Sequence, residues 1–378
     1  MTAGCLRNLR ILRLLVSIVF FMIIFICASY SNTSMWGPQL VIPMKLSWNI
    51  TRTVLPIMEL NNTGEFGLSQ QLLRSQSLNI TEQQLNTNTD ETRISSSSQS
   101  IETSNLFTEA NQLYETGHQN VDLDIAHVCP LNGRTTILLI LISSALSHER
   151  QRMAIRQTWG HYAARRDVGI AFVLGRSLNE TENKALKWEN YLYGDLIRGN
   201  FIDSYDNLTL KTISSLEWTE KHCNRAKYIL KTDDDMFINV PKLLNFVEEQ
   251  LKHNVKKTIF GRLAKKWPPV RNKKSKYYVS HGQFRGLYPE FTTGPAYLIT
   301  GDIVNDLYVR ALKMVYLKLE DVFITGIVAK SLNIKRVHVN EFKNRRMKLT
   351  TKNIQNSFSI HRISCSEQFE VWQKQHEK

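Results

Sequence analysis

The sequence predicts an α/β domain in which helices flank a mainly parallel β-sheet. Between about residues 135 and 239, apolar runs of strand length alternate with amphipathic segments of helix length. The apolar runs are continuous, as in strands that are covered on both faces. This alternation is typical of a parallel sheet with helices on its two sides. With 378 residues, the chain also has room for extensions outside the domain.

The first strand is expected at 135–144, "TTILLILISS", which carries no charge. A helix over 148–160 follows, because apolar residues recur between charges and Gly160 can end a helix. The alternation continues with a strand at 168–175, a helix with an acidic first turn at 179–194, a helix at 205–223 and a strand at 226–239. Ligands bind outside the carboxyl ends of strands in such sheets, so the acidic end of the last strand is a candidate site.

Residues 14–30 form an uncharged apolar run of about the length that crosses a bilayer. Arg7, Arg10 and Arg13 precede this run, so the positive-inside rule predicts a cytoplasmic tail of residues 1–13 and a type II signal anchor. A cleaved signal peptide is the alternative. In both cases the remainder of the chain is expected on the lumenal or extracellular side.

Residues 31–128 are rich in Asn, Thr, Ser and Gln and show no sustained hydrophobic period. Such a segment cannot bury enough apolar surface to offset the entropy of ordering it. We therefore expect a flexible, glycosylated stem that precedes a lumenal domain at 129–378. Candidate N-glycosylation sequons occur at Asn32, Asn49, Asn61, Asn79, Asn179 and Asn207.

The basic charge is confined to the predicted domain. Residues 129–378 hold 41 Lys and Arg against 24 Asp and Glu, whereas residues 1–128 hold 7 against 10. A basic head can attract a nucleotide diphosphate or an acidic glycan, and the lumenal compartment excludes nucleic acid as a partner. For most of these residues, a solvated basic surface explains the charge equally well.

The cysteines suit an oxidising compartment. Cys5 and Cys27 fall beside or within the predicted span, which leaves Cys129, Cys223 and Cys365 in the lumenal part. Three cysteines cannot all pair within one chain, so one bridge and one free or intermolecular thiol are expected. Our preference is Cys129 with Cys223, because each precedes an apolar strand-like run and parallel neighbours bring their starts together.

The stretch "KTDDDMF", residues 231–237, places three aspartates at the end of an apolar strand. On an extended chain, Asp233 and Asp235 would converge while Asp234 faces away. Two converging carboxylates suit Mg²⁺ or Mn²⁺, which keep positions open for water and substrate phosphates. The alternatives are a solvated turn rich in Asp and a structural Ca²⁺ site.

Two further features carry candidate site residues. Glu320 and Asp321 lie at the start of an amphipathic helix, where an acidic pair either compensates the helix dipole or supplies a general base. His361 lies in the apolar run "SFSIHRISC" near the C-terminus. A lone histidine there is either a satisfied core residue or a ligand.

Six blocks of the chain, in order, resemble one family: "MAIRQTWG", "YDNLTLKT", "AKYILKTDDDMFINV", "FTTGPAYLIT", "LEDVFITGI" and "SIHRISC". They resemble animal glycosyltransferase family 31, the β1,3-galactosyl- and β1,3-N-acetylglucosaminyltransferases, which also includes Fringe. The resemblance covers essentially the whole predicted domain. The predicted anchor and stem fit the type II Golgi membrane layout typical of this family.

The resemblance implies a GT-A fold and an inverting transfer from a UDP-sugar to a 3-hydroxyl of a glycan acceptor on a glycoprotein or glycolipid. It implies dependence on Mn²⁺, with Mg²⁺ as the alternative, and it leaves a homodimer open. Asp321 would be the catalytic base, with Glu320 beside it to orient the acceptor. The remaining implied roles are metal binding by Asp235, His361 and Asp233, and donor binding by Arg152, Arg156, Asp233, Asp234 and Gly294.

The resemblance leaves two donor sugars open. UDP-galactose is the first expectation and UDP-N-acetylglucosamine the alternative. Relatives often have a glycine-rich stretch where this chain has "TTGPAY", and Pro295 fixes φ and lacks a backbone donor, so the donor contact can differ. A catalytically silent glycan- or partner-binding module is the alternative from another class. The acidic cluster, the second acidic pair and His361 together speak against it.

Overall fold

The structure, a computed structural model, describes residues 108–117 and 125–377. The predicted tail, the predicted span at 14–30, nearly all of the stem and the sequons at Asn32, Asn49, Asn61 and Asn79 lie outside these residues. Within the described ranges, no helix is long and apolar enough to cross a membrane. The described residues all belong to one compact unit, Asn88–Lys378.

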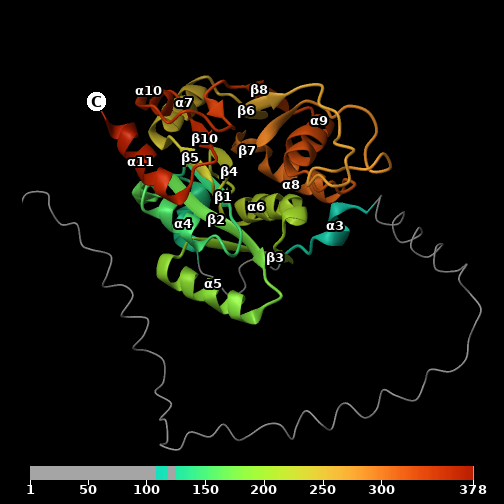
Figure 1. The fold of residues 1–378 in the computed structure, drawn as a ribbon, viewed down its shortest axis with the longest axis horizontal. Coiled ribbons are helices and arrows are strands. Elements are labelled where there is room, and N and C mark those ends of the chain that lie inside the picture. The colour runs from blue at the N-terminus through green and yellow to red at the C-terminus, as the bar shows by residue number, and fades with distance from the viewer. Residues whose placement is uncertain (1–107, 118–124, 378) are drawn as a thin grey trace, which may run out of the picture. The chain divides into compact units, whose positions relative to one another are not determined.

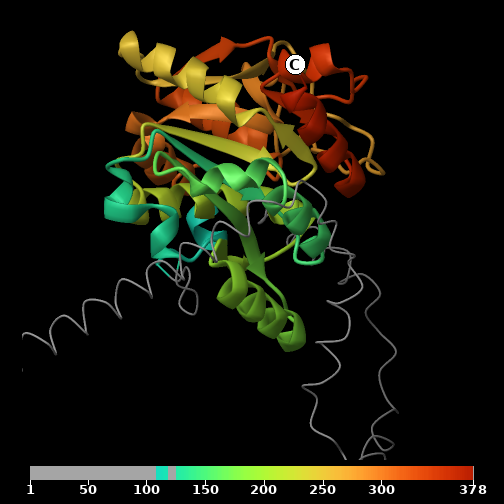
Figure 2. The ribbon, with the colours of Figure 1, turned by 90° about the vertical axis from the view of Figure 1, so that its left-hand side faces the viewer.

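The described residues form a seven-stranded sheet with the strand order β3-β2-β1-β4-β7-β6-β8 (Figures 1 and 2). Strands β3, β2, β1 and β4 run parallel, whereas β7 is antiparallel to both β4 and β6, and β8 is parallel to β6. The strands are β1 (Leu138–Ser143), β2 (Val168–Arg176), β3 (Leu196–Ile202), β4 (Tyr228–Asp233), β6 (Thr258–Ala264), β7 (Phe291–Thr300) and β8 (Lys335–His338).

The predicted α/β fold with a mostly parallel central sheet is confirmed. The strands predicted at 135–144, 168–175 and 226–239 contain β1, β2 and β4. The sequence did not reveal β3, whose segment "LIRGNFI" mixes polar and apolar residues, or the antiparallel β7. The second omission matters for the site, because the first residues of β7 lie beyond the paired end of β4.

Two hydrophobic cores cover the two faces of the sheet. Alternate strand residues point to opposite faces, so in β1 Leu139 joins one core and Leu138 the other. The first core contains residues of α6 (Leu208–His222), α8 (Val304–Leu312) and the π-helical segment η8 (Val322–Val328), which continues into α9 (Ala329–Ser331). The second contains residues of α4 (Glu149–Arg156), the 3₁₀ segment η5 (Trp159–Ala164), α7 (Val240–Lys252), α10 (Thr351–Gln355) and α11 (Cys365–His376).

Helix α5 (Glu180–Tyr193) extends from the domain beside β3 (Figures 1 and 2). It ends at Gly194, which has φ 64°, a left-handed conformation that glycine adopts without strain. The helix predicted over 148–160 is shorter than expected, because α4 ends at Arg156 and η5 follows it. A short helix, α3 (Ala110–Leu113), lies in the segment predicted as stem, but Ala110 and Tyr114 are buried in the first core, so this part of the segment packs with the domain.

A small second sheet brings the C-terminal region to the acidic cluster. Its strands are β5 (Met236–Ile238), β10 (Ser359–His361) and β9 (Phe342–Lys343), with β10 in the middle. Strand β10 is antiparallel to β5, and His361 pairs with Met236. His361 is thereby held next to the residue that follows Asp235.

A disulfide joins Cys129 to Cys223, with Cα atoms 5.6 Å apart. Parallel pairing of β1 with β4, in which Leu138 lies opposite Tyr228, brings the chain before each strand together. Cys365 carries a free thiol. The bridge lies at the amino ends of these strands, the opposite edge of the sheet from the acidic cluster.

Candidate active site

Three elements meet at the carboxyl edge of the parallel strands. Ser143, the last residue of β1, pairs with Asp233, the last residue of β4. Strand β7 passes this end of β4 in the antiparallel direction. The helical segment that begins at Glu320 reaches the same place, because Oδ2 of Asp321 accepts a hydrogen bond from the Gly294 N–H at 3.0 Å. This edge is where ligands bind in open α/β sheets.

The three aspartates of the cluster point to different partners. The extended geometry predicted across them is wrong, because β4 ends at Asp233 and the chain turns at Asp234 and Asp235 to form β5. Asp234 does face away from its neighbours: its Oδ2 accepts from Ser144 Oγ at 2.7 Å and lies 2.9 Å from His148 Nδ1. The bond to Asp234 raises the pKa of His148 above its ordinary value.

Asp233 is bound to a buried lysine that the sequence reasoning did not single out. Lys231 Nζ lies 2.7 Å from Asp233 Oδ1, 3.4 Å from Glu320 Oε2 and 3.0 Å from the Gly294 carbonyl oxygen. Glu320 also accepts a short hydrogen bond from the Tyr297 hydroxyl. Burial alone lowers the pKa of Lys231, but the charges of Asp233 and Glu320 outweigh burial and raise it. Lys231 is therefore held as a buried cation between two carboxylates.

Asp321 accepts backbone hydrogen bonds with both oxygens. Oδ1 accepts from the Val322 N–H at 2.9 Å, which caps the helical segment, and Oδ2 accepts from Gly294. Burial raises the pKa of Asp321, and the two backbone bonds only partly oppose this shift. A raised pKa in a carboxylate at a ligand-binding edge suits a general base. The proposed role in dipole compensation is compatible with this geometry, because one oxygen does cap the helix.

The residues proposed for metal binding can be tested for fit. His361 Nε2 lies 3.3 Å from Asp235 Oδ2, and both side chains reach the surface, with 21% and 43% of their areas exposed. An imidazole nitrogen and a carboxylate oxygen suit Mn²⁺. Among the described residues, no three His, Cys, Asp or Glu side chains gather as a metal-binding group, and Asp233 is engaged with Lys231. The pair therefore fits a cation that takes its other ligands from water and substrate phosphates.

The two arginines that were expected on the donor lie in a buried ion-pair cluster. Arg152, 1% exposed, binds both oxygens of Glu189 and donates to Ser144 Oγ at 3.1 Å. Arg156 binds Glu189 and both oxygens of Asp195. Arg152 can thus act on the acidic cluster through Ser144 and Asp234. This arrangement disfavours the predicted direct contact of either arginine with a donor, because both guanidinium groups are already bound to carboxylates.

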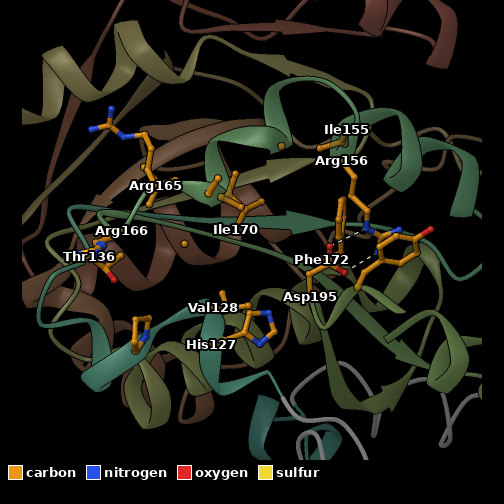
Figure 3. Close-up of a pocket in the computed structure, with 17 residues that line it drawn as sticks. His127, Val128, Thr136, Ile155, Arg156, Arg165, Arg166, Ile170, Phe172 and Asp195 are labelled. Atoms are coloured by element: carbon orange, nitrogen blue, oxygen red, sulfur yellow. Dashed lines mark hydrogen bonds and ion pairs between the residues drawn. The ribbon is translucent and has the colours of Figure 1, made fainter. Parts of the chain in front are cut away.

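A cavity of about 280 Å³ lies against β2, with Arg156 and Asp195 at one end and Arg165 and Arg166 toward the other (Figure 3). The Arg156 guanidinium also lies over the ring of Phe172, 4.9 Å from its centroid. None of the residues of the acidic cluster lines this cavity. A second cavity, of about 450 Å³, lies at the opposite edge of the sheet, around Tyr228 and Asp302. Neither cavity is lined by the residues of the candidate site.

Three contact residues of the site were missed from the sequence. Lys231 had a signal, because a lysine two positions before Asp233 lies on the same face of the strand and directly follows an apolar run. His148 and Ser144 follow β1, where the carboxyl-edge rule applies, but nothing in their own sequence distinguishes them. Their role depends on the parallel pairing of β1 with β4.

Comparison with known proteins identifies the family. A model of the Galactosyltransferase family matches residues 150–340. A β1,3-galactosyltransferase 5 from Pan paniscus is 35% identical over 238 residues, which cover 61% of this chain and 76% of that protein. A β1,3-galactosyltransferase 1 from Mus musculus is 32% identical over 240 residues, which cover 62% of this chain and 72% of that protein.

A solved structure of a glycosyltransferase involved in glycosylation of the major capsid of PBCV-1 is also similar. It has a TM-score of 0.31 and 11% identity, and the match covers 62% of this chain and 98% of that one. A similarity of this size supports no conclusion about fold or function.

The fold and the site together define an α/β protein with a cluster of acidic residues at the carboxyl edge of its sheet, which is the candidate site. The family match and the two relatives make this assignment specific. The chain belongs to the galactosyltransferase family and is a glycosyltransferase enzyme.

Proposed function

We propose that the protein is an inverting β1,3-galactosyltransferase that moves galactose from UDP-galactose to a 3-hydroxyl of a glycan acceptor. The acceptor would be carried on a glycoprotein or glycolipid. The relatives named β1,3-galactosyltransferase support the donor and the linkage. The expected GT-A architecture is part of this proposal.

One observation carries the proposal: the acidic end of β4 and the acidic start of a helix nearly ninety residues later are joined through the Gly294 peptide and Lys231. One acidic group can then serve the donor while the other serves the acceptor. Single displacement needs this two-sided arrangement, because the attacking hydroxyl and the departing diphosphate lie on opposite faces of the sugar.

Asp321 is the proposed base. It accepts the proton of the acceptor hydroxyl as that oxygen forms its bond to the anomeric carbon and the bond from this carbon to UDP breaks. UDP leaves with the electron pair of the broken bond. Glu320, which is held by Tyr297 and Lys231, fixes the helix start from which Asp321 projects.

Asp235 and His361 are proposed to hold a divalent cation, Mn²⁺ or Mg²⁺. When bound, such a cation stabilises negative charge on a diphosphate. Asp233 and Asp234 are proposed to lie against the nucleotide sugar. His148 supports Asp234 in this position, since the two side chains are 2.9 Å apart.

The proposed setting is the Golgi membrane, with a type II anchor at 14–30, a stem and a lumenal catalytic domain. Of the described sequons, Asn179 caps α5 by accepting from the Thr181 N–H through Oδ1, which leaves its amide nitrogen for a glycan. Asn207 instead donates its amide nitrogen to the Ile202 carbonyl oxygen at 2.8 Å, and the hydroxyl of Thr209 is buried. We therefore propose Asn179 as the glycosylated site of this pair.

The test is transfer by the purified full-length protein in detergent. The protein is incubated with Mn²⁺ and either UDP-galactose or UDP-N-acetylglucosamine, with a panel of glycan acceptors, and the product linkage is read by NMR. We expect a β1,3-linked galactose. Transfer from UDP-N-acetylglucosamine alone would establish the other donor, and no transfer from either UDP-sugar would refute the proposal.

A further inference from the structure

We infer that Lys231 is a positioning residue that holds the base-bearing helix and the donor-side carboxylate at a fixed separation. This inference rests on the proposed function, because it assigns the two sides of the site to donor and acceptor. Lys231 itself touches neither substrate in this proposal. It acts through the three groups that it contacts.

Lys231 contacts both the donor side of the proposed site and the acceptor side. Its ammonium binds Asp233 at the end of β4, Glu320 at the helix start and the Gly294 carbonyl oxygen in β7. The N–H of the same Gly294 binds Asp321. Gly294 is thus held from both ends, by the lysine at its carbonyl oxygen and by the proposed base at its amide nitrogen.

A hydrogen bond couples β7 to the proposed base, because the Gly294 N–H donates to Asp321 Oδ2 at 3.0 Å. Asp321 lies directly against this peptide: a Cβ atom placed on Gly294 would make ordinary contacts with Asp321 Oδ2 at 3.4 Å and with Asp321 Cβ at 3.5 Å. A shift of β7 relative to β4 would therefore break this hydrogen bond or move the base with it. Lys231 opposes such a shift, because its strand and its Gly294 contact belong to these two neighbouring strands.

Stability alone does not account for a cation at this position. Lys231 is 6% exposed and follows the apolar first half of strand β4. Replacing buried ion pairs by apolar side chains of similar size is often neutral or stabilising, so an apolar residue at 231 with neutral partners would serve the fold as well. A positive charge at Lys231 is needed if the reaction requires Asp233 and Glu320 as carboxylates, because these buried carboxylates then need a cation as a partner.

A fixed separation between Asp321 and Asp233 matters more for transfer to the acceptor than for hydrolysis of the donor. The base, the attacking hydroxyl and the anomeric carbon must align, and a misplacement of about 1 Å can cost about 10²-fold in rate. Attack by water on the same donor is less demanding, since water does not need to be oriented together with a bound acceptor. Loss of Lys231 should therefore reduce transfer to the acceptor more than hydrolysis of the donor.

The experiment measures this ratio in the full-length protein. Release of UDP from UDP-galactose is followed with and without acceptor for wild type, Lys231→Met and Lys231→Arg. The control is Tyr114→Phe, which removes a hydrogen bond to the buried Glu217 away from the site and should lower the melting temperature. A purely structural defect reduces transfer and hydrolysis together, because both depend on the fraction of folded enzyme.

We expect the ratio of transfer to hydrolysis to fall at least about tenfold in both Lys231 variants and to stay at the wild-type value in Tyr114→Phe. If Lys231→Met does not fold, Lys231→Arg decides, since it keeps the charge but changes the shape of the cation. A wild-type ratio in the folded Lys231 variants would overturn the inference and leave the proposed function intact. Absence of galactosyl transfer in the wild type would instead refute the proposed function.

Discussion

Two clusters of charged side chains lie near the carboxyl ends of β1 and β4, and their charges are balanced in different ways. In the arginine cluster, two arginines pair with two carboxylates: Arg152 and Arg156 form ion pairs with Glu189, and Arg156 also pairs with Asp195. The acidic cluster of Asp233, Asp234 and Asp235 lies beside the acidic pair Glu320 and Asp321. Lys231 forms ion pairs with Asp233 and Glu320 only, so the carboxylates here outnumber the lysine.

The difference agrees with a structural role for the arginine cluster and with the ligand-binding role proposed for the acidic cluster. Burial raises the pKa of Glu189, but the arginines outweigh it and leave that pKa below the ordinary value. Burial also raises the pKa of Asp233, Glu320 and Asp321, and here the available partners do not offset it. An arriving cation or acceptor proton would supply the missing positive charge. Substitutions in the arginine cluster should therefore lower the stability of the protein, whereas substitutions in the acidic cluster and at Asp321 should lower activity or metal binding.

The largest effect is expected from Asp321→Asn. The amide cannot accept the proton of the attacking hydroxyl, so kcat should fall by up to about 10⁴-fold. The amide has nearly the same shape, so binding of UDP and Mn²⁺, measured by calorimetry, should stay near the wild-type value. Unchanged turnover in this variant would refute the assignment of Asp321 as the base.

The role of Asp321 as a base should also be visible in the pH dependence of the wild-type activity. The active form of Asp321 is deprotonated, so kcat/KM should rise as the pH rises through its pKa. Because burial raises that pKa, the rise should lie above the ordinary range of an aspartate. A pH–rate profile over the acidic range checks this, and a rise at or below pH 3.8, the ordinary value, would contradict it.

The arginine cluster should respond in stability. Glu189→Gln removes the shared carboxylate and leaves the 1% exposed Arg152 without its ionic partner. Breaking a buried pair in this way costs about 3–5 kcal/mol, which urea unfolding can measure. The matched control is Asp235→Asn, whose carboxylate is 43% exposed and should leave the unfolding free energy within about 0.5 kcal/mol of wild type. Equal loss in both variants would remove the distinction between the clusters.

The acidic cluster should respond in metal binding. Asp235→Asn removes one of the two proposed protein ligands, so the apparent affinity for Mn²⁺ in the presence of UDP should fall at least about tenfold. A thermal shift assay with Mn²⁺ and UDP, added separately and together, measures this effect. Stabilisation of the wild type by Ca²⁺ with no response to UDP would favour a structural calcium site instead.

The sequence predicted the parts of the molecule that depend on local pattern. The strand that ends at Asp233 and the helix that starts at Glu320 both follow from apolar runs next to acidic residues. The contacts between them could not be predicted, because they depend on β7 entering the sheet in the antiparallel direction. The same holds for Arg152, whose pattern on an amphipathic helix gives no indication that Glu189, on another helix, would enclose it.

The smallest predicted effect lies at the surface, in the cap of α11. Ser364 and Glu367 form a capping box, and Arg346 binds both oxygens of Glu367. The hydrogen bond from Arg346 is the main cause that lowers the pKa of Glu367 from 4.5 to about 2. A depressed folded-state pKa adds stability that is present above pH 4.5 and is lost as the pH falls through about 2.

Because the pair is partly exposed and screened by solvent, its contribution should be about 1 kcal/mol. Glu367→Gln should therefore lower the unfolding free energy by about that amount at neutral pH, and the difference from wild type should shrink below pH 4.5. Urea unfolding at neutral and acidic pH measures both values. A difference that stays constant with pH would show that the glutamate acts by its shape and not by its charge. In that case this surface pair would differ from the arginine cluster, where the loss of a charged partner is expected to determine the change in stability.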